Sequence, residues 1–196
     1  MPAVITRLLG PLKRLVARTR APADSWGRLD HAPPLAQFGP GARHEFSHYL
    51  QGTSSVTISS VAEMQEWLLG CEYQTDEALF HEEDFWQHPD TFERMRAGDC
   101  EDFALWAWRT LIALNVDVDF VVGLCTSEGR PQFRHAWIVF RDDGLEYVLE
   151  PAATHRDRMI QPLAAVRHQY LPQIGVDRHA RRFTYRGSTG GLLHTL

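Results

Sequence analysis

Apolar and polar positions repeat at helical spacing in the middle of the chain. After residue 100, the stretch FALWAWRTLIAL carries apolar side chains at intervals of three and four, which predicts a helix buried in the core. Upstream, Ser60 and Glu63 form a capping-box pattern before apolar residues at the same spacing, so we expect a helix over residues 60–70. A shorter helix is expected to begin at Pro89, since proline suits a first helical turn.

After this expected helix, apolar side chains recur at every second residue. Alternation of apolar and polar side chains predicts three strands, at 118–125, 135–140 and 145–150. The turn residues 141–144 join the last two strands, residues 182–186 form a further candidate strand, and residues 161–170 a candidate helix. One helix followed by a run of antiparallel strands predicts an α+β fold in which that helix packs on the sheet.

The first 42 residues differ from the rest in composition. Residues 1–20 hold five basic side chains and no acidic one, with leucines on one apolar face. This pattern predicts either contact with a membrane surface or a partner, or a frayed terminus. Residues 21–42 are rich in Pro, Gly and Ala, as linkers are. We therefore expect one folded domain over residues 43–187 and a flexible tail over 188–196.

Composition and charge narrow the class of protein. The 196 residues are 44% hydrophobic and carry a net charge of −5, which is ordinary for a globular domain and argues against a general nucleic-acid binder. No apolar run reaches transmembrane length, and the basic start lacks the apolar core of a signal peptide, so a cytoplasmic location is expected. Three cysteines form no zinc-binding spacing and no disulfide framework.

The segment RAGDCEDFA places a single cysteine where the expected core helix begins. Asp99 is a suitable N-cap, and Asp102 follows three residues later. Cys100 then lies in the first turn, where free backbone N–H groups and the helix dipole favour an anion. The sequence predicts a thiol whose pKa is lowered toward neutrality, and hence a nucleophile. The alternative is a small buried residue beneath a capped helix.

The two strands after the Cys100 helix bring an imidazole and a carboxylate together. If residues 141–144 form a four-residue loop, His135 faces Glu150 directly. If only the last two of them form the turn, Trp137 faces Glu150 and His135 lies one pair further along. In both registers His135 and Glu150 project from the same face, because side chains alternate with a period of two. A three-residue loop would separate them.

Cys100, His135 and Glu150 thus provide the parts of a Cys–His–carboxylate triad. The imidazole would take the thiol proton and return it to the leaving group, while the carboxylate would orient the ring. Taken singly, His135 and Glu150 could instead be polar residues at a strand end and a sheet edge. Together they predict a thiol-dependent hydrolase that cleaves peptide or isopeptide amides of a protein or peptide substrate through an acyl-thioenzyme.

The region before the cysteine is strongly acidic. Residues 72–102 contain eleven Asp or Glu, against two basic residues, Arg94 and Arg96. Such a run is either a solvated face or a site for a cation or a basic substrate. The sequence leaves both interpretations open.

Three motifs in order, GDCEDFA, HAWIVF and YVLEP, resemble the transglutaminase-like cysteine protease superfamily. Within it, the chain resembles the bacterial transglutaminase-like cysteine proteinases of the LapG type, which cleave adhesins; DFWQHP also looks like the region before their nucleophile. The resemblance covers residues 60–152 and implies a papain-like core, with Cys100 as nucleophile and His135 as base. Glu150 occupies the position of the acid, which is usually Asp in that family.

The resemblance also implies a metal, because in that family the carboxylates around the cysteine bind Ca²⁺. The matching positions are Asp99, Glu101 and Asp102. Hard oxygen ligands suit Ca²⁺, but three residues cannot fill six to eight positions, so backbone carbonyls, water or other acids from the preceding run would have to contribute. Alternatively, Asp99 and Asp102 only cap the helix.

An acyl-transfer site also needs donors for the oxyanion. The backbone N–H of Cys100 is one candidate, and the side chains of Trp86 and Gln87 are others, although Trp86 could equally be a core residue. Two rival functions fit the same residues. The acyl group could pass to an amine, as in an acyltransferase of the transglutaminase type, or the fold could be a degenerate binding or regulatory module without catalysis.

Overall fold

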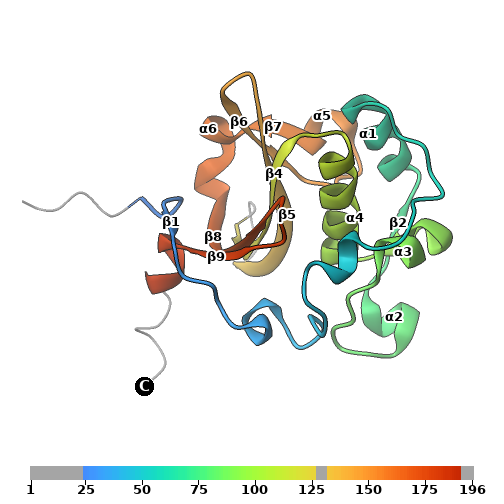
Figure 1. The fold of residues 1–196 in the computed structure, drawn as a ribbon, viewed down its shortest axis with the longest axis horizontal. Coiled ribbons are helices and arrows are strands. Elements are labelled where there is room, and N and C mark those ends of the chain that lie inside the picture. The colour runs from blue at the N-terminus through green and yellow to red at the C-terminus, as the bar shows by residue number, and fades with distance from the viewer. Residues whose placement is uncertain (1–23, 127–131, 191–196) are drawn as a thin grey trace, which may run out of the picture.

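A computed structural model describes residues 24–126 and 132–190 of the chain, and the predicted docking segment 1–20 lies outside them. Seven strands form one antiparallel sheet in the order β1-β9-β8-β4-β5-β6-β7 (Figure 1). Their bounds are Arg28–Leu29 (β1), Asp117–Cys125 (β4), Phe133–Asp142 (β5), Leu145–Leu149 (β6), Ile160–Pro162 (β7), Tyr170–Asp177 (β8) and Arg182–Tyr185 (β9). The strands predicted at 118–125, 135–140, 145–150 and 182–186 are all present.

Most helices lie on one side of this sheet (Figure 1), whereas Leu163 and Val166 pack against its other face. The α-helices are α1 (Val61–Leu69), α2 (Asp76–Phe80), α3 (Pro89–Met95), α4 (Cys100–Ala113), α5 (Arg156–Met159) and α6 (Leu163–Val166). Short 3-10 helices lie at Leu35–Phe38, His48–Leu50, Arg167–Gln169 and Arg186–Gly190, and a small parallel pair is formed by β2 (Glu72–Tyr73) and β3 (Ala97–Gly98). As predicted, the Ser60 hydroxyl caps α1 by accepting the Glu63 N–H at 3.2 Å, and Pro89 begins α3.

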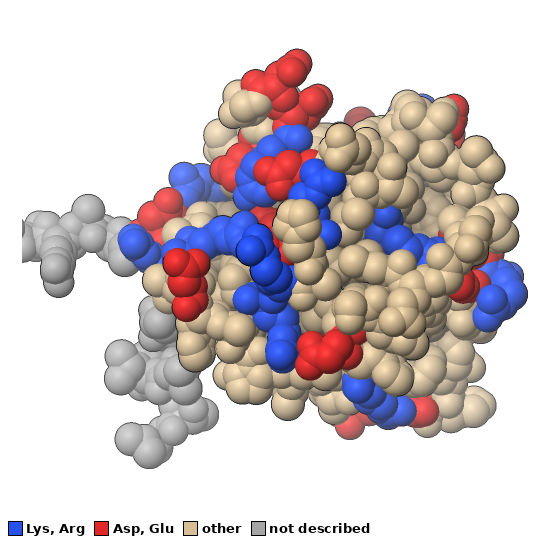
Figure 2. Space-filling view, viewed as in Figure 1, with Lys and Arg blue, Asp and Glu red and all other residues tan. Residues whose placement is uncertain are grey.

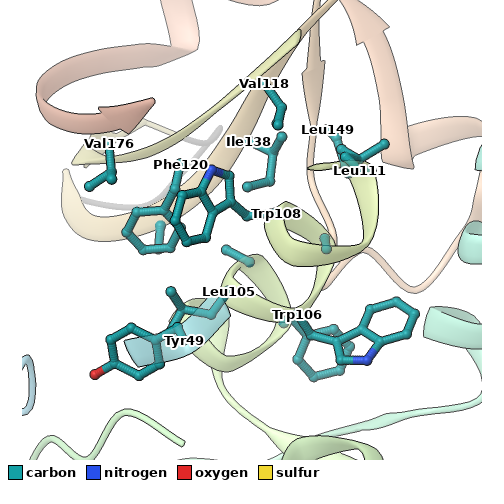
Figure 3. Packing of buried hydrophobic residues seen from close by; sticks show 14 of the residues in the cluster. Tyr49, Leu105, Trp106, Trp108, Leu111, Val118, Phe120, Ile138, Leu149 and Val176 are labelled. Atoms are coloured by element: carbon teal, nitrogen blue, oxygen red, sulfur yellow. The ribbon is translucent and has the colours of Figure 1, made fainter. Parts of the chain in front are cut away.

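Helix α4 carries apolar side chains on nearly all sides, and it packs between the sheet and neighbouring helices. Trp108 points toward Phe120 of the sheet, with ring centroids 6.5 Å apart, whereas Trp106 points to the other side of the helix (Figure 3). There the Trp106 ring stacks on Trp67 of α1 at 4.0 Å. Both α4 indoles are fully buried. A helix surrounded in this way is a core helix, and the predicted α+β fold, with the helix that begins at Cys100 packed on an antiparallel sheet, is confirmed.

The β5–β6 hairpin has the shorter of the two predicted turns. Asp142 pairs with Leu145, so the turn consists of Asp143 and Gly144. Their φ angles of 47° and 76° are both positive, as a two-residue turn matching the twist of its strands requires. This register places Trp137 opposite Glu150, the residue directly after β6, and His135 two positions further along β5 on the same face.

The predicted helix over residues 161–170 is wrong in its larger part. This stretch holds β7, the single turn of α6 and a 3-10 turn, and it leads into β8, a central strand that the sequence did not predict. Pro172 hides this strand in the sequence, since proline rarely occurs between two paired neighbours. The structure accommodates Pro172 at a bulge, where the register with β4 shifts between Val122 and Gly123.

The folded unit begins before the expected boundary at residue 43. Within the stretch 21–42, β1 pairs with β9 at the sheet edge, and Phe38 is buried in the main core. A two-residue strand is too short to show alternation, so the Pro- and Gly-rich composition concealed it. At the other end, the 3-10 turn extends to Gly190 and so includes the first three residues of the tail predicted from residue 188, and residues 191–196 lie outside the described part.

Acidic and basic side chains lie next to one another on the face shown in Figure 2. On the sheet, buried Asp119 holds the guanidinium groups of Arg141 at 3.0 Å and Arg28 at 3.4 Å, and Arg141 also reaches Glu146 at 3.2 Å. Within residues 24–126 and 132–190, no helix has both the length and the apolar character needed to cross a membrane.

Candidate active site

A cleft of about 250 Å³ lies at the N-terminal end of α4. The residues around it that matter for chemistry are Cys100, His135, Trp86, Tyr73, Asp84 and Asp99. They come from α4, β5, β2 and the loop between α2 and α3, so the cleft gathers side chains that are far apart in sequence.

The backbone before the cysteine is fixed by the small parallel sheet and by a buried carboxylate. Tyr73 pairs with Gly98, and a Cβ at Gly98 would lie 2.7 Å from the Asp102 Cβ, so only glycine fits there. Asp102 accepts the backbone N–H groups of Asp99 at 3.3 Å and Gln87 at 2.8 Å. These bonds set the entry angle of α4 and place Cys100 at its first turn.

His135 and Glu150 are in direct contact. His135 Nε2 and Glu150 Oε2 are 2.6 Å apart, although the two residues are 15 positions apart in sequence. Both side chains are largely enclosed, with exposed fractions of 11% and 21%. Because Nε2 is engaged by the carboxylate, Nδ1 is the ring nitrogen left to exchange a proton with another group. The hairpin register therefore brings together the pair that the sequence predicted.

The Cys100 thiol is held in its protonated form. It donates a hydrogen bond to Glu101 Oε2 at 3.1 Å, and Ala136 of β5 lines the same cleft. Burial raises the pKa of the thiol well above its ordinary value, and the negative charges of Glu101 and Asp99 raise it further. The predicted lowering of this pKa is wrong, because the helix dipole, worth about 1 kcal/mol, is outweighed by desolvation and by two adjacent carboxylates.

Five carboxyl groups are packed beside the cysteine: Asp76, Asp84, Asp99, Glu101 and Asp102. Oxygens of Asp76, Asp84 and Glu101 lie within 4.8 Å of one another, as do those of Asp76, Asp99 and Asp102. Burial raises the pKa of Asp76 to about 6, and burial followed by mutual repulsion also raises the pKa of Glu101. One oxygen each of Asp76, Asp84 and Asp99 is buried without a hydrogen-bond partner. Such oxygens are suited to a cation.

The side chains of Gln87 and Trp86, which the sequence predicted as oxyanion donors, lie in different surroundings. The Gln87 amide nitrogen donates to the Ala97 carbonyl at 2.9 Å and to Asp102 Oδ2 at 2.5 Å, and the residue is 1% exposed. The side chain of Gln87 therefore supports Asp102 and does not supply a donor to the cleft, which corrects that expectation. Trp86 is 5% exposed and lines the cleft beside Cys100.

Sequence reasoning did not single out Asp76 and Asp84 from the acidic run. Asp76 Oδ2 accepts the Phe85 N–H at 2.6 Å, and Asp84 fits against Gly41, where any side chain would collide with it. The sequence holds no pattern that predicts these contacts, because one joins the start of α2 to the loop after it, nine positions away, and the other joins Asp84 to a loop near residue 41.

Comparisons with known proteins give a partial match. No protein-family model and no curated protein matches the sequence. Among solved structures, LapG from Legionella pneumophila is similar, with a TM-score of 0.49 and 20% identity over 67% of this chain and 70% of that chain. The calcium-bound LapG structure gives a TM-score of 0.45 and 21% identity over 58% of this chain and 61% of the LapG chain. Both likenesses extend over part of each chain only.

Proposed function

We propose that this protein is a thiol-dependent hydrolase that cleaves peptide or isopeptide amide bonds through an acyl-thioenzyme. The contact that carries the proposal is the 2.6 Å pair of His135 and Glu150, in which His135 lines the same cleft as Cys100. A carboxylate on Nε2 orients the ring and stabilises its protonated form. Nδ1 is then the atom that receives the proton of the thiol.

The reaction divides into acylation and deacylation. His135 Nδ1 takes the proton from Cys100, and the sulfur forms a bond to the carbonyl carbon. The backbone N–H of Cys100 and the indole N–H of Trp86 stabilise the oxyanion. As the C–N bond breaks, His135 returns the proton to the leaving amine. Water, deprotonated by His135, then hydrolyses the thioester and releases a carboxylic acid and the free thiol.

We further propose that the acidic cluster binds Ca²⁺. Asp76, Asp84, Asp99 and Glu101 would hold the ion, because their hard, partly unpartnered oxygens lie close together. Asp102 is the least suited of the predicted ligands, since its oxygens accept hydrogen bonds from Gln87 and from the backbone. A bound divalent cation would offset the charges that keep the pKa of the thiol high.

Acetylation by p-nitrophenyl acetate tests the proposal without knowledge of the natural substrate. We expect peptide mass spectrometry to find the acetyl group on Cys100, with faster p-nitrophenol release in calcium than in EGTA. Cys100→Ala should abolish both signals. Cys71→Ala is the matched control, because Cys71 is also partly buried but lies outside the cleft. Ester turnover that persists in Cys100→Ala would overturn the proposal.

The same assay separates the rival functions. If added glycinamide becomes acetylated at the expense of free acetate, the site is an acyltransferase. If Cys100 reacts no faster than Cys71 in calcium as well as in EGTA, the fold is a binding module.

A further inference from the structure

A tyrosine lies beside Glu150 in a second cavity. This cavity of about 390 Å³ is lined by Glu150, Tyr170, Cys125 and Arg158 among others, whereas His135 lines the cleft that contains Cys100. Glu150 therefore lies between the two hollows, with His135 on one side. Tyr170 begins β8, the strand that the sequence did not predict.

We propose that Tyr170 is a positioning residue that holds Glu150 in the orientation needed to support His135. The inference rests on the proposed function and adds a fourth member to its site. Tyr170 and Glu150 line the same cavity, so the Tyr170 hydroxyl is the group that we propose donates to the Glu150 carboxylate, which also contacts His135 Nε2 at 2.6 Å. Two partners on one carboxylate restrict its rotation more than one partner does.

The rings of Tyr170 and His135 both pack against a third aromatic ring, that of Trp137. The Tyr170 ring packs on Trp137 with a centroid distance of 5.0 Å, and the Trp137 ring lies nearly parallel to the imidazole of His135, at 6.2 Å and 24°. Trp137 is fully buried, so it gives both neighbours a rigid support. Tyr170, Trp137, His135 and Glu150 thus form a chain of contacts whose two ends line the same cavity.

A glutamate has particular need of such a restraint. Its side chain has one more rotatable bond than aspartate, the residue usual at this position in the family that the motifs resemble, and a hydrogen-bonded carboxylate loses that freedom. Burial raises the pKa of Tyr170 above its ordinary value, and the charge of Glu150 adds to this effect. At neutral pH the hydroxyl therefore carries the proton that the proposed hydrogen bond requires.

Tyr170→Phe removes the donor and keeps the ring. We expect the maximal rate of Cys100 acetylation by p-nitrophenyl acetate to fall roughly tenfold, which is the loss of one hydrogen bond to a charged group. The concentration of ester at half-maximal rate should not change. Tyr147→Phe is the matched control, because the Tyr147 ring stacks on Phe140 and lines neither hollow.

A double-mutant cycle separates positioning from a general structural effect. In a Glu150→Ala background, Tyr170→Phe should cause no further loss of rate. An equal loss in both backgrounds, or a wild-type rate in Tyr170→Phe, would overturn the inference.

The inference can be tested even if the proposed function fails. Should wild-type Cys100 resist acetylation, nitrogen NMR of the histidine rings still reports on His135. We expect its ring signals to shift in Tyr170→Phe and to stay unchanged in Tyr147→Phe. His135 signals identical to wild type in Tyr170→Phe would refute a role for Tyr170 in holding the pair.

Discussion

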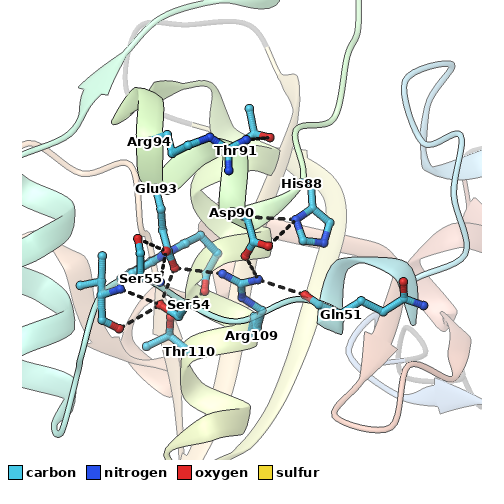
Figure 4. A network of polar contacts seen from close by, with 12 residues as sticks. Gln51, Ser54, Ser55, His88, Asp90, Thr91, Glu93, Arg94, Arg109 and Thr110 are labelled. Carbon is cyan, nitrogen blue, oxygen red and sulfur yellow. Dashed lines mark hydrogen bonds and ion pairs between the residues drawn. The ribbon is translucent and has the colours of Figure 1, made fainter.

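Buried carboxylates lie at two sites beside helix α4, and the two sites differ in how well hydrogen-bond donors surround the carboxylate oxygens. The first centres on Glu93 (Figure 4). Its oxygens accept hydrogen bonds from the Ser54 hydroxyl at 2.5 Å, the Ser55 N–H and hydroxyl at 2.8 and 2.9 Å, the Trp106 indole at 3.0 Å and Arg109 at 2.9 Å. Burial acts to raise the pKa of Glu93, but these donors outweigh it and the pKa is lowered. This carboxylate is satisfied by the protein alone.

The second group surrounds Cys100, and some of its carboxylate oxygens lack a hydrogen-bond partner. Burial raises the pKa of Asp76, Asp99, Glu101 and Asp102, and three of its oxygens lack a partner. Buried carboxylates with perturbed pKa values are typical of functional sites, so this difference supports the proposed site beside Cys100.

The largest expected effect is loss of the satisfied network. Glu93→Ala removes the charge that Arg109 pairs with and leaves four other donors without their acceptor, so the free energy of unfolding should fall by about 3–5 kcal/mol. Urea denaturation measures this directly. Glu66→Ala is the control, because Glu66 makes only an exposed pair with Arg156 and should cost less than about 1 kcal/mol. Equal effects of the two substitutions would remove the contrast between structural and surface carboxylates.

Calcium should stabilise the protein through the unsatisfied group. At a concentration 100 times the dissociation constant, binding adds about 2.7 kcal/mol to the free energy of unfolding. Asp76→Asn and Asp99→Asn should each reduce this gain, whereas Asp157→Asn, an exposed aspartate on α5, should retain it. A thermal or urea transition that is identical in calcium and EGTA would contradict the calcium site.

The smallest expected effect is a gain in the free energy of unfolding when one carboxylate of the cluster is neutralised. Without calcium, Asp76→Asn should stabilise the protein by about 1–2 kcal/mol at pH 7.5, after allowance for solvent screening, because the substitution removes a charge that the fold holds unfavourably. The pKa of Asp76 rises from 3.8 to about 6 on folding, so the folded state binds this proton more tightly. Calcium-free wild type should therefore gain stability as the pH falls from 7.5 to 5. Asp76→Asn should lack that gain, and a destabilised variant would refute the interpretation.

The sequence predicted the elements that carry local patterns. The apolar repeat after Cys100 defines α4, and the Asp143–Gly144 pair limits the hairpin to registers that bring His135 near Glu150. These predictions succeed because turn geometry and side-chain alternation are set by neighbours in the chain.

Features that depend on distant contacts were missed. The bulge at Pro172 exists only because β4 lies beside it, and Asp76 and Asp84 reach the site through loops that sequence cannot fold together. The error on Cys100 has the same origin. Its place at a helix start is a local property, whereas the burial and the carboxylates that raise its pKa are properties of the assembled core.

The central claim is that His135 generates the Cys100 thiolate. The most direct measurement is the rate of Cys100 alkylation by iodoacetamide at pH 7 in calcium, followed by peptide mass spectrometry, with Cys71 in the same molecule as internal reference. We predict that His135→Asn slows alkylation of Cys100 at least roughly tenfold, because an adjacent base is what raises the thiolate fraction, and leaves Cys71 unchanged. Equal rates for Cys100 in the wild type and in His135→Asn would contradict the account.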